Sequence, residues 1–290
     1  MDLNVLAEQS MIVRLRVHGW TGEVKDQVAT EEVAQAHGAS VREAGTYKKN
    51  LFPKSALKGI QKAESDLRNY HYLMTLPWLD QGGRILSSKH FMTYTEGLRE
   101  RREAYEAEAR KLVDDYDRLI QEAQVSLGSL FNGADYPSRE ALRGAYSVET
   151  LFTPFPKASD FRTEINAQAF EEAKTHLEET TRTAALRAEE VLQTQVITAI
   201  SKIAERFAVV HGSPGGTFRD SLLGNLETLL GLAPEMSLAA DSRLHDFCMQ
   251  ARVLCVDPSI PRGNADVRAL LAKTAFQLAY TMKQAFGVAA

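Results

Sequence analysis

An alternating stretch near the N-terminus decides the fold: Met11-Ile12-Val13-Arg14-Leu15-Arg16-Val17-His18. Its apolar residues Val13, Leu15 and Val17 fall on one face of an extended strand, and its basic residues fall on the other. One face can therefore pack on a core while the other stays wet and positive. The segment Ser147–Phe155 is rich in β-forming residues, and we expect it to pair with this strand at the edge of a small antiparallel sheet.

Most of the remaining sequence has helical periodicity. An apolar stripe runs from Lys54 to about Met74, and beside it Lys54, Lys58 and Lys62 recur every four residues as one outward row. The other expected helices span about 90–130, 161–211, 217–232, 236–256 and 264–287. The fold class is therefore α+β and predominantly helical, with a small antiparallel sheet packed on long antiparallel helices. So few strands exclude the five-stranded OB-fold.

Two glycine-bearing stretches interrupt this pattern. Leu76–Leu86 is rich in turn signals, and it is either a loop poised for contact or a hairpin connection. Gly212–Gly216 is the clearest break, and it lacks the lysine and the preceding strand of a phosphate-binding P-loop. We expect a mixed α+β region over 1–162 and a helical region over 163–290, with the helices after Gly212 completing a subunit interface of a homo-oligomer.

Composition places the chain among ordinary globular proteins. It has 290 residues, of which 44% are hydrophobic and 25% are charged, and its formal net charge is -4. No stretch approaches the roughly 18 apolar residues of a membrane helix, and the N-terminus does not match a secretory signal. These features predict a cytoplasmic protein without membrane contact, in the host cytoplasm if a phage encodes it.

The charge is distributed unevenly. Residues 42–102 hold twelve basic and six acidic side chains, a net charge of +6, which leaves -10 for the rest of a chain whose total is -4. The same segment holds seven of the 23 aromatic residues. Cations neutralise phosphates and flat rings stack on unpaired bases, so this pattern indicates binding of single-stranded nucleic acid. The competing interpretation is a solvated basic face over aromatic core residues.

The candidate DNA-binding residues follow from this pattern and from the N-terminal strand. Those expected to contact phosphates are Arg14, Arg16, Lys48, Lys49, Lys54, Lys58, Lys62, Arg84 and Lys89. Those expected to stack on bases are Trp20, Tyr47, Tyr72, Trp78 and Phe91. No sequence signature of a hydrolase, a dinucleotide site or a metal site occurs, and the paired carboxylates lie on helices rich in exposed charge. The sequence therefore predicts no enzyme activity, no cofactor and no metal.

Several short motifs are similar to a known family. They are Gly19-Trp20-Thr21-Gly22, Leu73-Met74-Thr75-Leu76-Pro77-Trp78, Arg84-Ile85-Leu86 with Phe91 and Tyr94, Asp135-Tyr136-Pro137-Ser138, Phe155-Pro156 and Asp160-Phe161-Arg162. In this order they resemble phage and bacterial proteins of largely uncharacterised function, and most of all the Drc-type single-stranded-DNA-binding RNA polymerase cofactors of Schitoviridae phages. The resemblance covers roughly residues 10–165. It implies sequence-tolerant binding of single-stranded DNA and assistance to a phage RNA polymerase at its promoters.

Three hypotheses remain open at this point. The first is a single-stranded-DNA-binding protein that serves as a polymerase cofactor. The second is a helical adaptor or scaffold that binds polymerase or other proteins through its acidic helices, without DNA. The third is a strand-annealing recombinase, which also uses basic grooves on ring-forming subunits.

Overall fold

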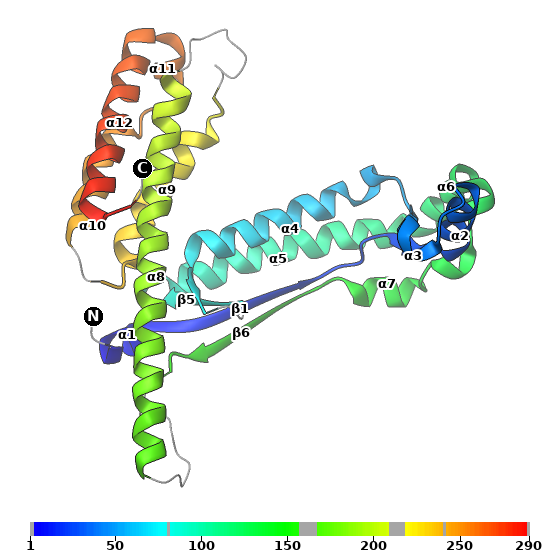
Figure 1. The fold of residues 1–290 in the computed structure, drawn as a ribbon. Helices are drawn as coiled ribbons and strands as arrows, with labels where there is room; N and C mark the ends of the chain where they lie inside the picture. Colours follow the sequence, from blue (N-terminus) through cyan, green and yellow to red (C-terminus); the bar gives the residue numbers. More distant parts are fainter. Residues whose placement is uncertain (1–2, 80–81, 157–166, 209–217, 240–241, 289–290) are drawn as a thin grey trace. The chain divides into compact units, whose positions relative to one another are not determined.

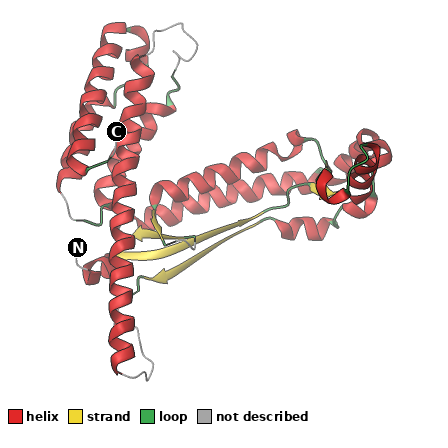
Figure 2. Ribbon diagram, viewed as in Figure 1, coloured by secondary structure: helices red, strands yellow, loops and turns green. Residues whose placement is uncertain are grey.

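The structure is a computed structural model, and it describes residues 3–79, 82–156, 167–208, 218–239 and 242–288 (Figure 1). This part of the chain forms two compact units, each assembled from separate sequence ranges. Unit 1 comprises Met1–Arg14, Tyr72–Met92 and Leu151–Ala290, and unit 2 comprises Leu15–His71 and Thr93–Thr150. The fold is α+β and predominantly helical, as the sequence predicts (Figure 2). The expected boundary at 162 lies outside the described residues.

A four-stranded sheet has the strand order β4-β5-β1-β6. Its strands are β1 (Ser10–His18), β4 (Leu76–Trp78), β5 (Gly83–Ser87) and β6 (Ser147–Pro154). The alternating N-terminal stretch is thus a strand, and the segment after Ser147 lies beside it at the edge, so both predictions are confirmed. β4 and β5 pair antiparallel, so Leu76–Trp78 and the residues from Gly83 onward are the two strands of a hairpin.

The strand β1 differs from its expected amphipathic pattern. Ile12 pairs with Ile85 and Val13 with Arg84, so consecutive residues of β1 face opposite sides of the sheet. Both Ile12 and Val13 are buried, so the prediction of one wet face is wrong for this half of the strand. Arg14 is only half-exposed, and its Nε atom is buried without a hydrogen-bond partner among the described residues. The exposed positive face begins further along, at Arg16 and His18.

Unit 1 is built around α8 (Ala167–Ala208). In Figure 1, α9 (Ser221–Met236), α10 (Ser242–Ala251) and α12 (Ala265–Phe286) gather around its C-terminal part. Buried alanines of α8 and α12, among them Ala204 and Ala275, allow the helices to pack closely. The short helices α1 (Leu3–Gln9) and α11 (Ser259–Gly263) complete the unit. Helices occur in each region where the sequence predicts them, but two of the bounds differ: α9 continues to Met236, and the helix expected over 236–256 begins only at Ser242 and ends at Ala251. Residues 161–166, 209–211 and the break at 212–216 lie outside the described residues.

One core joins the helices of unit 1 to the inner face of its sheet. It includes Ile12, Leu76 and Ile85 from the strands and Leu192 and Ile200 from α8. The buried Glu189 of α8 accepts hydrogen bonds from Ser237 Oγ at 2.9 Å and from the Leu238 amide at 2.7 Å. This carboxylate therefore fixes the turn that follows α9. None of the helices in the described ranges has an apolar stretch long enough to cross a bilayer.

Unit 2 is built around the antiparallel helices α4 (Lys54–Met74) and α5 (Phe91–Asp114), which lie side by side in Figure 1. The remaining elements are β2 (Glu23–Lys25), α2 (Gln27–Ala36), α3 (Val41–Ala44), β3 (Lys48–Asn50), α6 (Tyr116–Leu127) and α7 (Arg139–Ala145). β2 and β3 form an antiparallel two-stranded ribbon. Short 3-10 turns, Gly128–Leu130 and Gly133–Asp135, follow α6.

The helix expected over 90–130 is interrupted. Asp115 has φ -81° and ψ -2°, so α5 ends at Asp114 and α6 begins at Tyr116. The physical reason is local, because aspartate favours helix starts over helix interiors and the Asp115 carboxylate pairs with Arg118 at 2.6 Å. The apolar seam on which the prediction rested is nevertheless buried from Tyr105 through Tyr116 to Ala123.

Candidate nucleic-acid interface

Three lysines of α4 form the most coherent cationic feature of unit 2. Lys54, Lys58 and Lys62 are exposed and stand one turn apart, so together they span about 12 Å along the helix. We call them the lysine row. The opposite face of α4 is buried through Leu57, Ile60 and Leu67. This is the arrangement that the periodicity predicts, with an apolar stripe turned inward and the lysines turned outward.

The lysine row forms no ion pair within the described structure. Neither a hydrogen bond nor an ion pair to another described residue engages any of the three ammonium groups. The two acids of α4 are both paired instead, Glu64 with Arg68 at 2.8 Å and Asp66 with the Arg101 Nε atom at 3.2 Å. The positive charge that α4 presents to a ligand therefore comes from the lysine row.

Close contact with α5 holds α4 in place. At Gly97 an added Cβ would overlap the Tyr70 hydroxyl, so only glycine allows this ring to lie against α5. The Tyr70 hydroxyl donates to the Thr93 carbonyl at 2.7 Å, and the Arg101 guanidinium lies 4.0 Å from the ring centroid. These contacts make α4 a rigid support for its exposed lysines.

Trp20 lies at the N-terminal end of α4. The chain turns there after β1, and two tyrosine hydroxyls fix the turn: Tyr105 donates to the His18 carbonyl at 2.7 Å, and Tyr146 donates to the Trp20 carbonyl at 3.1 Å. Burial raises the pKa of both phenols, to about 12 for Tyr105. The half-exposed indole packs edge-on against Phe52, with ring centroids 5.4 Å apart. Trp20 is therefore a ring held at one end of the lysine row.

Gly22 makes this turn possible, and replacing it tests the arrangement. Its φ is +67°, and an added Cβ would lie 3.0 Å from Leu57 Cδ1. We expect Gly22→Ala to lower the free energy of unfolding by about 1–2 kcal/mol for the left-handed backbone alone. The loss should exceed that of Gly38→Ala, because the added Cβ also crowds Leu57. Gly38→Ala is the matched control, because Gly38 has φ +61° but open space around it. Urea unfolding of both variants gives the comparison, and an equal loss would show that Leu57 does not constrain Gly22.

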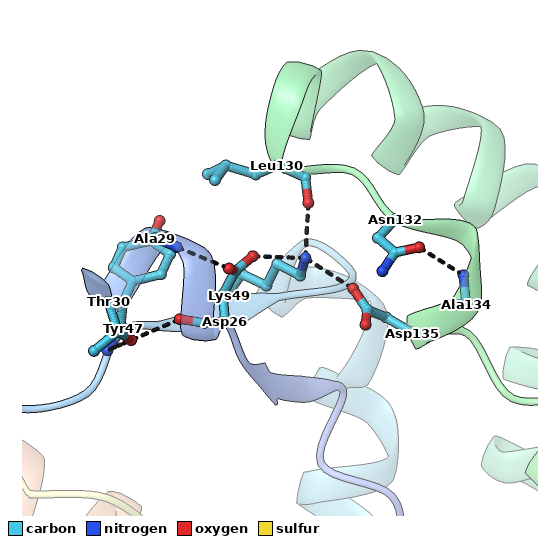
Figure 3. A network of polar contacts seen from close by, with 9 residues as sticks. All are labelled: Asp26, Ala29, Thr30, Tyr47, Lys49, Leu130, Asn132, Ala134 and Asp135. Atoms are coloured by element: carbon cyan, nitrogen blue, oxygen red, sulfur yellow. Dashed lines mark hydrogen bonds and ion pairs between the residues drawn. The ribbon is translucent and has the colours of Figure 1, made fainter. Parts of the chain in front are cut away.

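Lys49 is a correction to the predicted site. Its side chain is only 5% exposed, and its ammonium group lies 2.8 Å from Asp26 Oδ2, 2.8 Å from Asp135 Oδ2 and 2.8 Å from the Leu130 carbonyl (Figure 3). Burial disfavours the charged ammonium, but the bonds to Asp135 and Asp26 outweigh it and raise the pKa of Lys49. A buried cation with three partners joins segments of the fold and cannot reach a phosphate.

The same network lowers the pKa of Asp26. The largest cause is the hydrogen bond from the Ala29 amide, which the Asp26 carboxylate accepts as the N-cap of α2, and the bond from Lys49 is the next. Asn132 caps the 3-10 turn that carries Asp135 by accepting from the Ala134 amide at 3.0 Å (Figure 3). The Asp26 carboxylate is thus held by its own turn, and Asn132 stabilises the turn that carries Asp135.

The other candidates of unit 2 are accessible. Arg16 is exposed near the end of β1. Lys48, next to Lys49 on β3, points outward and lies 3.8 Å from Glu23. Tyr47 keeps more than a third of its surface exposed. Together with the lysine row and Trp20, these residues are the candidate interface of unit 2.

A second group of candidates belongs to unit 1. Arg84 donates to Thr75 Oγ1 at 2.7 Å and stands 4.9 Å from the Tyr72 ring centroid. Arg14 belongs to the opposite face of the sheet, because it follows Val13 and Val13 pairs with Arg84. Trp78 is a further correction: it is 6% exposed and packs on Phe155 with centroids 4.6 Å apart, so it cannot stack on a base. Phe91 packs edge-on against Phe152, and Lys89 is exposed.

The structure thus divides the predicted site into two sets. Unit 2 holds Arg16, Trp20, Tyr47, Lys48 and the lysine row, and unit 1 holds Arg14, Tyr72, Arg84, Lys89 and Phe91. Sequence reasoning missed the role of Asp26 and Asp135, which are the partners of Lys49. Only the capping pattern around Asp26 was readable beforehand.

Comparison with known proteins adds no relative. No protein-family model, no curated protein and no solved structure matches the chain.

Proposed function

We propose that this protein binds single-stranded DNA with little sequence preference and acts as a cofactor of a phage RNA polymerase. The observation that carries the DNA-binding part is the lysine row: three exposed ammonium groups without a partner among the described residues, beside two acids that are already paired. The proposed interface is the exposed side of α4 in unit 2, with Trp20 at its end.

The chemistry of this surface suits a single strand. A flexible strand can follow a short row of cations, and its unpaired bases can stack on an accessible ring such as Trp20 or Tyr47. Lysine supplies a point charge without a fixed hydrogen-bonding pattern, so it binds phosphate and carries no sequence information. Sequence-tolerant binding follows from these contacts.

The polymerase part of the proposal rests on the resemblance of the motifs between Gly19 and Arg162 to Drc-type cofactors. A protein that holds the single strand of an open promoter would stabilise the melted state, because it binds that state and not the duplex. This role places the protein in the host cytoplasm, where the polymerase works.

A salt titration tests the proposal. Fluorescence anisotropy should give tighter binding of labelled oligo-dT than of a duplex of equal length. If three phosphates are neutralised, log K should fall with log salt with a slope of about -2. Equal affinity for both forms, or affinity independent of salt, would contradict the proposal. In that case, capture of polymerase that persists after nuclease treatment would favour the adaptor, and annealing of complementary strands would favour the recombinase.

A further inference from the structure

Helices α8 and α12 of unit 1 enclose a surface hollow of about 650 Å³. Small side chains form much of its lining, and two aromatic and three charged residues stand around them. The lining residues are Ser201, Ala204, Glu205, Ala208, Ala272, Lys273, Phe276, Ala279, Tyr280 and Lys283. The alanines leave space that larger side chains would fill, so the hollow can accept an apolar group.

Two large rings beside the hollow are exposed to solvent. Phe276 is 66% exposed and Tyr280 is 59% exposed, and they stand one turn apart on the same face of α12. Neighbouring exposed rings form a contiguous apolar patch, and such patches are typical of interaction surfaces. This surface therefore carries both protruding rings and a hollow of the size that rings require.

Its charges are also mixed. Lys273 stands one turn before Phe276, and Glu205 lies across the hollow on α8. Neither residue forms an ion pair with another described residue. Two lysines, Lys273 and Lys283, and one carboxylate, Glu205, are thus unpaired among the described residues, so the surface can form lysine–carboxylate pairs with a copy of itself.

From these observations we infer that the α8–α12 surface binds a second copy of this chain. In a twofold interface the same patch is used by both protomers, so each patch must complement itself. Phe276 and Tyr280 of one protomer fill the alanine-lined hollow of its partner, and each Lys273 pairs with the Glu205 of the opposite protomer. The contact joins unit 1 of both chains.

The two rings supply part of the area that this partner requires. At their exposed fractions the two aromatic residues leave on the order of 250 Å² open in each protomer. A standard interface buries about 800 Å² per partner, so the rings supply about a third of it and the rest of the two helix faces must supply the remainder. The inference does not depend on the proposed function, since a dimer can form whether or not the protein binds DNA.

Sedimentation equilibrium of the full chain at micromolar concentrations tests the dimer. The wild type should sediment as a dimer, and Phe276→Asp with Tyr280→Asp should sediment as a monomer with at least a 100-fold weaker association. Val125→Asp is the matched control, because Val125 is 85% exposed on α6 of unit 2. Circular dichroism checks that all variants keep their helices. A monomeric wild type, or a double variant that still forms a dimer, overturns the inference.

Charge reversal tests the geometry independently. Lys273→Glu alone and Glu205→Lys alone should each weaken the dimer by about tenfold, and the combination should restore it. A combination weaker than either single variant contradicts the twofold pairing. Footprinting with oligo-dT tests whether the surface binds nucleic acid instead. Protection of Lys273 in a monomeric protein would assign the surface to nucleic acid and overturn the inference.

Discussion

Replacing Lys49 by Met should destabilise unit 2 by about 3 kcal/mol, the lower end of the range for breaking a buried ion pair. The side chain is 5% exposed, and its removal leaves Asp26 and Asp135 facing one another without a cation. The side chains of Asp26 and Asp135 are 12% and 17% exposed, so hydration reduces the cost of leaving the two carboxylates unpaired. The Leu130 carbonyl also loses its donor.

Trp20 can report this loss. Its ring contacts Phe52, and Phe52 in turn packs against Tyr116 and Tyr136, so its fluorescence follows the core beside the network. A Trp78→Phe background removes the other tryptophan, and urea unfolding then gives the free energy for unit 2. Lys48→Met is the matched control: Lys48 is adjacent on β3 but exposed, and it should have little effect. Equal losses for Lys48 and Lys49 would refute the network's structural role.

The same network predicts a pH dependence. The pKa of Asp26 is lowered in the folded state, so its contribution is fully present above its ordinary value near 3.8 and is lost as the pH falls through the lowered value. The pKa of Lys49 is raised, so its contribution is fully present below about 10.5 and is lost only as the pH rises through the raised value. We expect the stability difference between wild type and Lys49→Met to be constant from pH 5 to 9. It should narrow below pH 4, and a difference unchanged at pH 2 would contradict this account.

Local periodicity was enough to predict most elements of the fold. The alternation around Val13 and the stripe from Leu57 to Met74 each specify one element whatever the rest of the chain does. Whether the second face of a strand is also covered depends on parts of the chain that are distant in the sequence. Ile12 is buried because α8, more than 150 residues away, packs on that side of the sheet, so no pattern within the strand could reveal it.

The candidate site shows the same limit. Lys48 and Lys49 are neighbours of equal chemistry, and a pattern of basic residues treats them alike. Their difference comes from Asp135, 86 residues further on, which the fold brings to one of them. The sequence likewise predicts stacking for Trp78 because this residue lies in the basic, aromatic-rich segment. Its partner Phe155 is distant in the sequence, and only the fold brings the two rings together. The lysine row was readable because all three of its members lie on one helix.

The sequence alone does not predict that two rings of α12 are exposed. Phe276 and Tyr280 lie four residues apart within a helix that is rich in alanine and leucine, where an apolar residue is ordinarily buried. Only the structure shows that α8 packs against the neighbouring face and leaves these rings outside. The helical pattern predicts the helix, but it does not predict which face of the helix other elements leave uncovered.

Reversing the lysine row should remove most of the proposed affinity for single-stranded DNA. Lys54→Glu, Lys58→Glu and Lys62→Glu together replace three attractive contacts by three repulsive ones, so we expect binding of oligo-dT at 50 mM salt to weaken at least about 100-fold. The slope of log K against log salt should also become shallower by about 2, because fewer counterions are released. Anisotropy titrations at several salt concentrations measure both quantities.

Folding should survive this change, which makes the result interpretable. The three side chains are exposed and without described partners, and acidic residues near a helix N-terminus interact favourably with the helix dipole. The melting temperature of the triple variant should therefore stay close to that of the wild type. Lys174→Glu, Arg182→Glu and Arg187→Glu on α8 form a control with the same change of net charge. Equal losses in both variants would mean that DNA senses only total charge and that α4 is not the interface, whereas a loss confined to the α4 variant locates binding on the lysine row.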